Sequence, residues 1–416
     1  MLLKEAFFYS ASKAVPGIVG LASVILFIRI FGSSEYGKYS LLLSQCNLIV
    51  AIVFGWLNQS QLRYYSIDSL NSEYRTNQLR ALSFCTLICI IILSILMFFQ
   101  TLSKQIWIIS LMTVIAIGFF NYLKTIYQVK LLPVKIIFMT SVQSLLGLLA
   151  PILLFVFGWS GEITILLGVG FSFLIVLLLS KLFDKNNLSL EHINNGQDKN
   201  SNALIKKWFS YGTPLSLWFA AGMALPFLDR LFINQFLTSD ELGIYSGLQE
   251  LLTRIYSLIL FPLILAVHPR IMNLWNDSNF HEVVMLIKKS IRVFLFIGAI
   301  LLFIVMIFND FIFSMIQKAI PQVSNQNKEL ILPLLFSGFL WQLSFITHKM
   351  LELKEKTMFM VLAIFPSIVI NIIGNSIFLP RFGQLATANT ALLSALTYCT
   401  ITFVYSIHSM NRVNKI

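Results

Sequence analysis

Four ionisable residues lie in two consecutive apolar stretches: Asp229 and Arg230 in one, Glu250 and Arg254 in the next. Glu250 and Arg254 are four positions apart with the acid first, a spacing that allows a salt bridge along one helix. Neighbouring residues point about 100° apart on a helix, so Asp229 and Arg230 cannot simply pair with each other. An isolated charge costs ~2.5–3.5 kcal/mol at the centre of a membrane helix. These residues therefore favour an anionic-substrate or ion-coupling site over an ion-pair network that only stabilises the fold.

A polar stripe surrounds Glu250 and Arg254. Its members recur at the spacing of one helix face and are Ser246, Gln249, Glu250, Thr253, Arg254 and Ser257. The stretch 38–58 repeats part of this pattern through Ser40, Ser44 and Asn47. Lipid cannot satisfy polar groups, so we expect both stripes to face protein or water, as walls of one cavity or as helix contacts. A weaker stripe with Asn371 and Asn375 is interpreted as helix packing or a cytoplasmic mouth.

Two further cations lie in the first apolar stretch. Lys13 is about two turns into it, before Pro16–Gly17, and faces either a cavity or a structural partner. Arg29 is near its outer end, where arginine side chains commonly extend to the membrane surface, and that interpretation is favoured here.

The elements that carry these residues are those of an all-α polytopic membrane protein. The 416 residues are 57% hydrophobic and 12% charged, about half the charge of a typical soluble protein. A span needs about 20 apolar residues. We expect about twelve transmembrane helices, near 5–31, 38–58, 81–101, 106–129, 136–158, 162–182, 209–236, 243–268, 288–309, 330–350, 357–379 and 385–408.

The net charge of +12 reflects topology. With a cytoplasmic N-terminus, the outer segments hold few of the 30 Lys and Arg residues, namely Lys38, Lys104, Lys318, Lys328 and Arg381. This bias predicts that both termini are cytoplasmic and that the number of spans is even. No nucleic-acid partner is expected. The four cysteines fall within predicted helices, and no Cys/His cluster suggests a metal or another cofactor.

The chain also contains a duplicated segment. Glu35-Tyr-Gly-Lys-Tyr-Ser40 recurs as Glu241-Leu-Gly-Ile-Tyr-Ser246, each time after an apolar stretch. Its glycines, Gly37 and Gly243, suit a tight loop or the start of a helix, and Ser239 is expected to cap the second copy's helix. We predict an N-terminal six-helix lobe (1–182), a cytoplasmic linker (183–207) and a C-terminal six-helix lobe (208–416), with a substrate site between the lobes.

The segments FGSSEYGKYSLLLS and LDRLFINQFLTSDELGIYSGLQELL resemble those of O-antigen and polysaccharide flippases (Wzx type). That family lies within the multidrug/oligosaccharidyl-lipid/polysaccharide exporter superfamily. The resemblance implies a MATE-like fold with two lobes around a central cavity. It also implies transfer of an undecaprenyl-diphosphate-linked oligosaccharide from the inner to the outer leaflet of the bacterial inner membrane. A polysaccharide polymerase and a chain-length regulator are implied as membrane partners.

Carried over residue by residue, the resemblance assigns the diphosphate to Arg254, Arg230, Lys13 and Arg29. Gln249 and Asn47 are added from the polar stripes as candidate cavity contacts. The acidic pair Asp229 and Glu250 matches no fixed family motif, and the fourteen-helix arrangement of lipid II flippases is absent.

The energy source and the substrate leave alternatives open. The chain has no Walker A pattern, so coupling to H⁺ or Na⁺ is expected, with Glu250 or Asp229 as the carrier. A multidrug or cation antiporter would favour an acidic cavity. The candidate residues here are four cations and two acids, and this net positive charge favours an anionic substrate. A membrane polysaccharide polymerase or ligase would need catalytic groups in a large outer loop. The longest outer loop, about 310–329, has no His and no acid/base pair, so we expect a transporter and not an enzyme.

Overall fold

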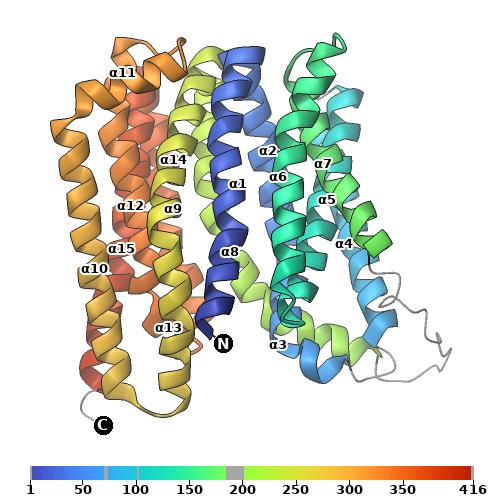
Figure 1. Ribbon diagram of the computed structural model, residues 1–416, viewed down its shortest axis with the longest axis vertical. Helices are drawn as coiled ribbons and strands as arrows, with labels where there is room; N and C mark the ends of the chain where they lie inside the picture. The colour runs from blue at the N-terminus through green and yellow to red at the C-terminus, as the bar shows by residue number, and fades with distance from the viewer. Residues whose placement is uncertain (1, 70–73, 101–102, 184–200, 414–416) are drawn as a thin grey trace. The chain divides into compact units, whose positions relative to one another are not determined.

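A computed structural model describes residues 2–69, 74–100, 103–183 and 201–413 (Figure 1). These residues form helices and no β-strand. The helices are α1 (Leu2–Phe31), α2 (Ser33–Val53), α3 (Gly55–Asp68), α4 (Tyr74–Gln100), α5 (Lys104–Val129), α6 (Pro133–Val156), α7 (Glu162–Phe183), α8 (Ser201–Phe236), α9 (Ser239–Asn276), α10 (Phe280–Ile307), α11 (Asn309–Ala319), η1 (Asn325–Leu330), α12 (Ile331–Thr347), α13 (Lys349–Leu353), α14 (Thr357–Phe382) and α15 (Gln384–Val413).

Each of the twelve predicted apolar stretches overlaps at least one helix, but 38–58 is divided between α2 and α3, and 330–350 runs from η1 through α12 into α13. Eleven helical spans among the described residues are long and apolar enough to cross a membrane. The pair α2 and α3 passes the same test together, with a bend of 46° at their junction, and gives up to twelve spans. The prediction of an all-α polytopic membrane protein is therefore confirmed.

The described helices form two compact units. Unit 1 comprises Met1–Ser10, Gly20–Ser40 and Ala224–Ile416, and unit 2 comprises Ala11–Val19 and Leu41–Met223. Helices α1, α2 and α8 therefore contribute residues to both units.

These units do not coincide with the predicted lobes. Compact units need not follow the boundaries that a duplication creates, so the six-plus-six division stays a prediction. Residues 201–207 of the predicted linker belong to helix α8. The rest of that linker, 184–200, lies outside the described residues.

Within unit 1, α12 packs against α9, α10 and α15, and α14 packs against α15 (Figure 1). The span that contains α12 is 72% buried, more than any other span, so it forms the centre of this unit. Within unit 2, α5 packs against α3, α4, α6 and α7. Most other spans carry exposed Leu, Ile and Phe side chains, as expected for surfaces that face lipid.

The two copies of the duplicated segment lie against each other within unit 1. A Cβ atom on Gly37 would lie 2.6 Å from the backbone nitrogen of Gly243, and one on Gly243 would lie 2.5 Å from the carbonyl carbon of Ser33. The hydroxyl of Ser33 donates to Asp240 Oδ1 at 2.6 Å. Both glycines lie inside helices, α2 and α9. They lie near the start of each helix, one of the two placements that the sequence suggested, and allow a close approach of two backbones there rather than a tight loop.

The start of α9 also differs from the prediction. Thr238, not Ser239, caps the helix. Its hydroxyl accepts from the Glu241 backbone N–H at 3.3 Å, and the Glu241 carboxylate accepts from the Thr238 N–H at 3.0 Å. This reciprocal capping box fixes where α9 begins.

Candidate functional site

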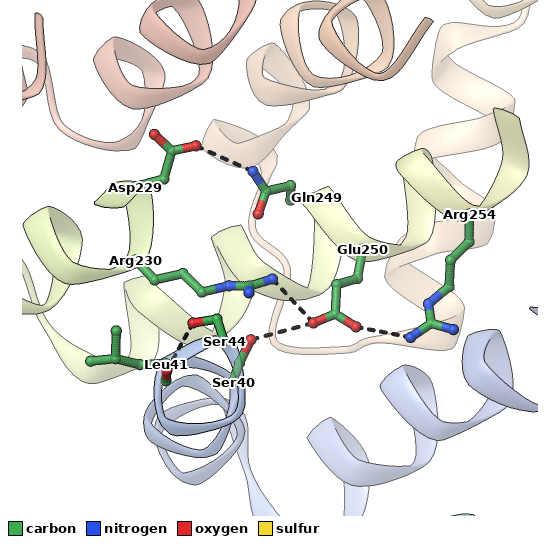
Figure 2. Close-up of polar contacts among 8 residues, drawn as sticks. All are labelled: Ser40, Leu41, Ser44, Asp229, Arg230, Gln249, Glu250 and Arg254. Carbon is green, nitrogen blue, oxygen red and sulfur yellow. Dashed lines mark hydrogen bonds and ion pairs between the residues drawn. The ribbon is translucent and has the colours of Figure 1, made fainter. Parts of the chain in front are cut away.

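Three charged side chains from α8 and α9 form one cluster, which we call the Arg–Glu–Arg cluster: Arg230, Glu250 and Arg254 (Figure 2). Glu250 Oε1 accepts from Arg230 Nη2 at 3.1 Å, and Glu250 Oε2 accepts from Arg254 Nη2 at 3.2 Å. Ser40 of α2 donates to Glu250 Oε1 at 3.4 Å. The i,i+4 salt bridge that the sequence allows between Glu250 and Arg254 is therefore present. Arg230 pairs with Glu250 of α9 and not with its neighbour Asp229.

The exposed fraction of the side chains increases from Arg230 through Glu250 to Arg254. The side chains of Arg230, Glu250 and Arg254 are 8%, 24% and 36% exposed. Among the described residues, the buried Nε of Arg230 has no hydrogen-bond partner. The guanidinium of Arg254 lies directly over Gly20 of α1, where a Cβ atom would be 2.6 Å from its central carbon. A larger residue at position 20 would therefore displace Arg254.

A second group of side chains, which we call the Asp229 cluster, surrounds a buried carboxylate. Asp229 is 1% exposed. Its Oδ1 accepts from Nδ2 of Asn371 at 2.8 Å and of Asn375 at 3.2 Å. Its Oδ2 accepts from the Tyr245 hydroxyl at 3.2 Å and from Gln249 Nε2 at 3.3 Å. All four of these donors are neutral, so the carboxylate is stabilised by dipoles rather than by a direct ion pair.

Two side-chain amide oxygens of the Asp229 cluster accept no hydrogen bond from the described residues. Gln249 Oε1 and Asn375 Oδ1 are buried and have no hydrogen-bond partner among the described residues. The described residues contain no group of three or more His, Cys, Asp and Glu side chains that could hold a metal ion. A carboxylate together with amide oxygens can nevertheless bind a hard cation.

The helix geometry separates the two clusters. Asp229 and Arg230 are neighbours on α8 but point to different partners, as their spacing predicts. Gln249 and Glu250 are neighbours on α9 and divide in the same way: Gln249 points to Asp229, and Glu250 points to Arg230 (Figure 2).

Three of the predicted site residues lie elsewhere or are not described. Arg29 Nε donates to the Ala319 carbonyl at 2.5 Å, and its Nη2 donates to the Lys318 carbonyl. Arg29 thus binds the C-terminal end of α11, where a cation is favoured, and is not brought to the Arg–Glu–Arg cluster. Asn47 lies half-buried on α2 in unit 2. The side chain of Lys13 lies outside the described part of the chain.

This placement changes the charge balance. Without Arg29 and Lys13, Arg230 and Arg254 stand against Asp229 and Glu250. The positive bias that the sequence suggested is therefore not carried by the described residues alone.

Sequence reasoning missed Asn371 and Asn375, because their stripe on α14 was interpreted as packing or a cytoplasmic mouth. It also missed the donor role of Tyr245. The i,i+4 spacing of the two asparagines was the available signal, but nothing local indicates that α14 meets α8.

Comparison with known proteins gives the family and the fold. Residues 2–275 match the family described as polysaccharide biosynthesis protein, and residues 214–377 match the family MatE. No curated protein matches the chain.

Similar solved structures include MATE transporters. One is the inward-facing conformation of a multidrug resistance MATE family transporter of the MOP superfamily, with 13% identity over 98% of this chain and 99% of that chain and a TM-score of 0.72. Its outward-facing counterpart shows 11% identity, coverage of 100% and 96%, and a TM-score of 0.63. MATE in the straight conformation shows 13% identity, coverage of 100% and 96%, and a TM-score of 0.64. At these identities the likeness shows the fold alone. Because the match of residues 2–275 extends over more than half of the sequence, the chain belongs to the family described as polysaccharide biosynthesis protein.

Proposed function

We propose that this protein is a flippase that moves an undecaprenyl-diphosphate-linked oligosaccharide from the inner to the outer leaflet of a bacterial cytoplasmic membrane. The cargo is an O-antigen unit or another surface polysaccharide repeat unit, and both termini lie in the cytoplasm. The observation that carries this proposal is a pair of arginines, Arg230 buried and Arg254 partly exposed, within a chain of the polysaccharide biosynthesis family.

The Arg–Glu–Arg cluster suits a diphosphate. An arginine fork can bind two phosphate oxygens at once, which a lysine cannot do. Arg254 and Glu250 are more exposed than Arg230, which supports access of an anion from the side of Arg254. An anion can therefore reach Arg254 first and Arg230 behind it.

Asp229 is the better of the two candidates for ion coupling. The carboxylate of Glu250 is held by two arginines, whereas the donors to Asp229 among the described side chains are all neutral. A buried carboxylate without a cation is costly, and binding of H⁺ or Na⁺ removes that cost. The Oε1 of Gln249 and the Oδ1 of Asn375, which have no partner within the described part of the chain, could complete the coordination of Na⁺.

Replacement of the arginines tests the substrate assignment. Arg230→Ala and Arg254→Ala should each abolish surface polysaccharide, because a charged hydrogen bond is worth about 1.5–3 kcal/mol, or roughly 10- to 150-fold in binding. Arg270→Ala is the matched control, since Arg270 is an exposed arginine on the same helix, α9. Normal polysaccharide in both cluster variants, at normal amounts of inserted protein, would exclude the cluster from the site.

Replacement of Asp229 tests the coupling. In proteoliposomes, transport by the wild type should depend on a pH or Na⁺ gradient, and Asp229→Asn should lose that dependence. Asp277→Asn, at the exposed C-terminal end of α9, is the control and should behave as the wild type. Unchanged gradient dependence in Asp229→Asn would remove Asp229 from the coupling site.

A multidrug or cation antiporter is the second candidate. It is favoured by the match of residues 214–377 to the family MatE and by the even balance of acids and arginines in the two clusters. Under this alternative, the Arg230→Ala and Arg254→Ala variants would alter cation efflux and leave surface polysaccharide unchanged.

A further inference from the structure

Glu250 occupies the position that an anionic ligand would take between two arginines. Each of its oxygens accepts from one guanidinium, as the oxygens of a phosphate do (Figure 2). We propose that Glu250 is an internal substitute for the phosphate of the substrate: a bound diphosphate displaces it, and the displacement releases α2 from the cluster. This inference rests on the proposed function, because it requires an anionic substrate.

The arrangement of Arg230 points to a ligand other than Glu250. Its side chain is buried, and Glu250 satisfies only Nη2. The Nε of Arg230 is left without a partner among the described residues. An unsatisfied buried donor is costly. A phosphate group offers several oxygens and can bind Nε and Nη2 of the same guanidinium together, which the shared carboxylate of Glu250 does not do.

The increase in exposure from Arg230 to Arg254 indicates the side from which a diphosphate would reach the cluster. Arg254 is the most exposed member of the cluster, and its ion pair with Glu250 spans i,i+4 on one helix. This pair is only partly exposed, and an i,i+4 pair on one helix contributes little stability when solvated, so a stronger anion can exchange with it. A diphosphate can therefore bind Arg254 first, compete for Arg230 next, and expel Glu250 by repulsion between like charges.

The cluster touches each helix that is shared by the two units. Ser40, which donates to Glu250, is the last residue of α2 in unit 1. Gly20, against which Arg254 lies, is the first residue of the second α1 segment in unit 1. Arg230 follows soon after α8 enters unit 1 at Ala224. Movement of Glu250 and Arg254 therefore acts on α1, α2 and α8 close to the points where they leave the unit.

The release is specific to one end of the contact between α2 and α9. Ser40 loses its acceptor when Glu250 moves, whereas the hydrogen bond from Ser33 to Asp240 and the Gly37–Gly243 approach do not involve the cluster. Glu250 thus acts as a positioning residue. It couples binding of the diphosphate at the arginines to the hydrogen bond that Glu250 makes with Ser40 of α2.

Binding affinity gives the decisive measurement. The full-length protein in nanodiscs of zwitterionic lipid is titrated with undecaprenyl diphosphate and, separately, with inorganic pyrophosphate. Glu250→Gln should bind both roughly tenfold more tightly than the wild type, because the competing carboxylate is gone. Its transport should nevertheless be slower, since the neutral amide is not expelled. Glu35→Gln removes the same charge from the first turn of α2, where the carboxylate pairs with Lys38, a residue outside the cluster; it is the control and should bind as the wild type does.

The outcomes separate the two proposals. Wild-type binding with equal or weaker binding by Glu250→Gln would overturn the internal-substitute inference and leave the flippase proposal intact. Equal tightening by Glu35→Gln would also overturn it, because the effect would then be one of net charge. Absence of binding to the wild type would reject the flippase proposal itself. If Glu250→Gln does not fold, Glu250→Asp, whose shorter side chain holds the arginines less well, should still bind more tightly than the wild type, and failure to do so refutes the inference.

Accessibility of position 44, one turn further along α2 than Ser40, tests the release. Ser44 is 7% exposed, and its hydroxyl donates to the Leu41 carbonyl and not to Glu250. In a background with the four native cysteines replaced by alanine, a Ser44→Cys thiol should react with maleimide faster when undecaprenyl diphosphate is bound. An unchanged rate in a sample that binds the ligand would contradict the release of α2.

Discussion

Gly243 lies so close to the backbone of Ser33 that one methyl group should separate the first turns of α2 and α9. In Gly243→Ala, the added Cβ would lie 2.5 Å from the Ser33 carbonyl carbon and closer still to its oxygen. Carbon atoms in contact are about 3.5–4.0 Å apart, so the two helices must move by about 1 Å. The obstacle is backbone, which cannot rotate away as a side chain can.

The net effect can be worked out from two opposing contributions. Overpacking costs about 1–3 kcal/mol, and a rigid obstacle places this contact near the upper end. Alanine favours a helix over glycine by about 1 kcal/mol. We therefore expect Gly243→Ala to lose about 2 kcal/mol. Gly222→Ala is the matched control, because Gly222 is also helical but a Cβ there would meet nothing within 4 Å. It should gain stability or remain neutral.

Two measurements check this expectation. The melting temperature of the purified chain should fall for Gly243→Ala and not for Gly222→Ala. A disulfide between Ser33→Cys and Asp240→Cys, whose native side-chain oxygens are 2.6 Å apart, should form more slowly in the Gly243→Ala background. If Gly243→Ala and Gly222→Ala have the same melting temperature, and the disulfide forms at the same rate with and without Gly243→Ala, the two backbones do not make this contact.

Two further predictions concern stability. Asp68 accepts from the buried Trp208 Nε1 at 2.7 Å, so Asp68→Ala should cost about 2–3 kcal/mol of unfolding free energy, measured by the loss of thermal stability. Asp310→Ala, which removes a 92% exposed carboxylate, should produce no measurable change, and equal losses in the two variants would refute this reasoning. At the start of α9, Thr238→Ala should cost about 1 kcal/mol and speed amide exchange in the first turn about fivefold, whereas Ser239→Ala should not. The reverse order would show that Ser239 is the cap.

The sequence predicted the features that depend on neighbouring positions along one helix. Runs of about 20 apolar residues gave the spans, because the thickness of the bilayer sets their length. The i,i+4 spacing gave the Glu250–Arg254 contact. The angle between successive side chains showed that Asp229 and Arg230 need different partners.

Contacts between helices distant in the sequence could not be predicted. Asn371 and Asn375 meet Asp229 across 142 and 146 positions, and their stripe on α14 looks the same whether it packs on a helix or binds a carboxylate. Arg29 was a candidate for the anion site, yet it binds carbonyls at the end of α11, 289 and 290 positions away.

Hydropathy and helical periodicity are local properties, so the amino-acid sequence by itself determined the membrane class, the helices and the face of α9 on which Glu250 and Arg254 lie. The packing of the helices decided what each of those side chains meets. It placed Arg230 on Glu250, Asn371 on Asp229 and Gly37 against Gly243. Each of these contacts depends on the distance and rotation of two helices, which many residues along both helices set together, and no spacing within one helix encodes them.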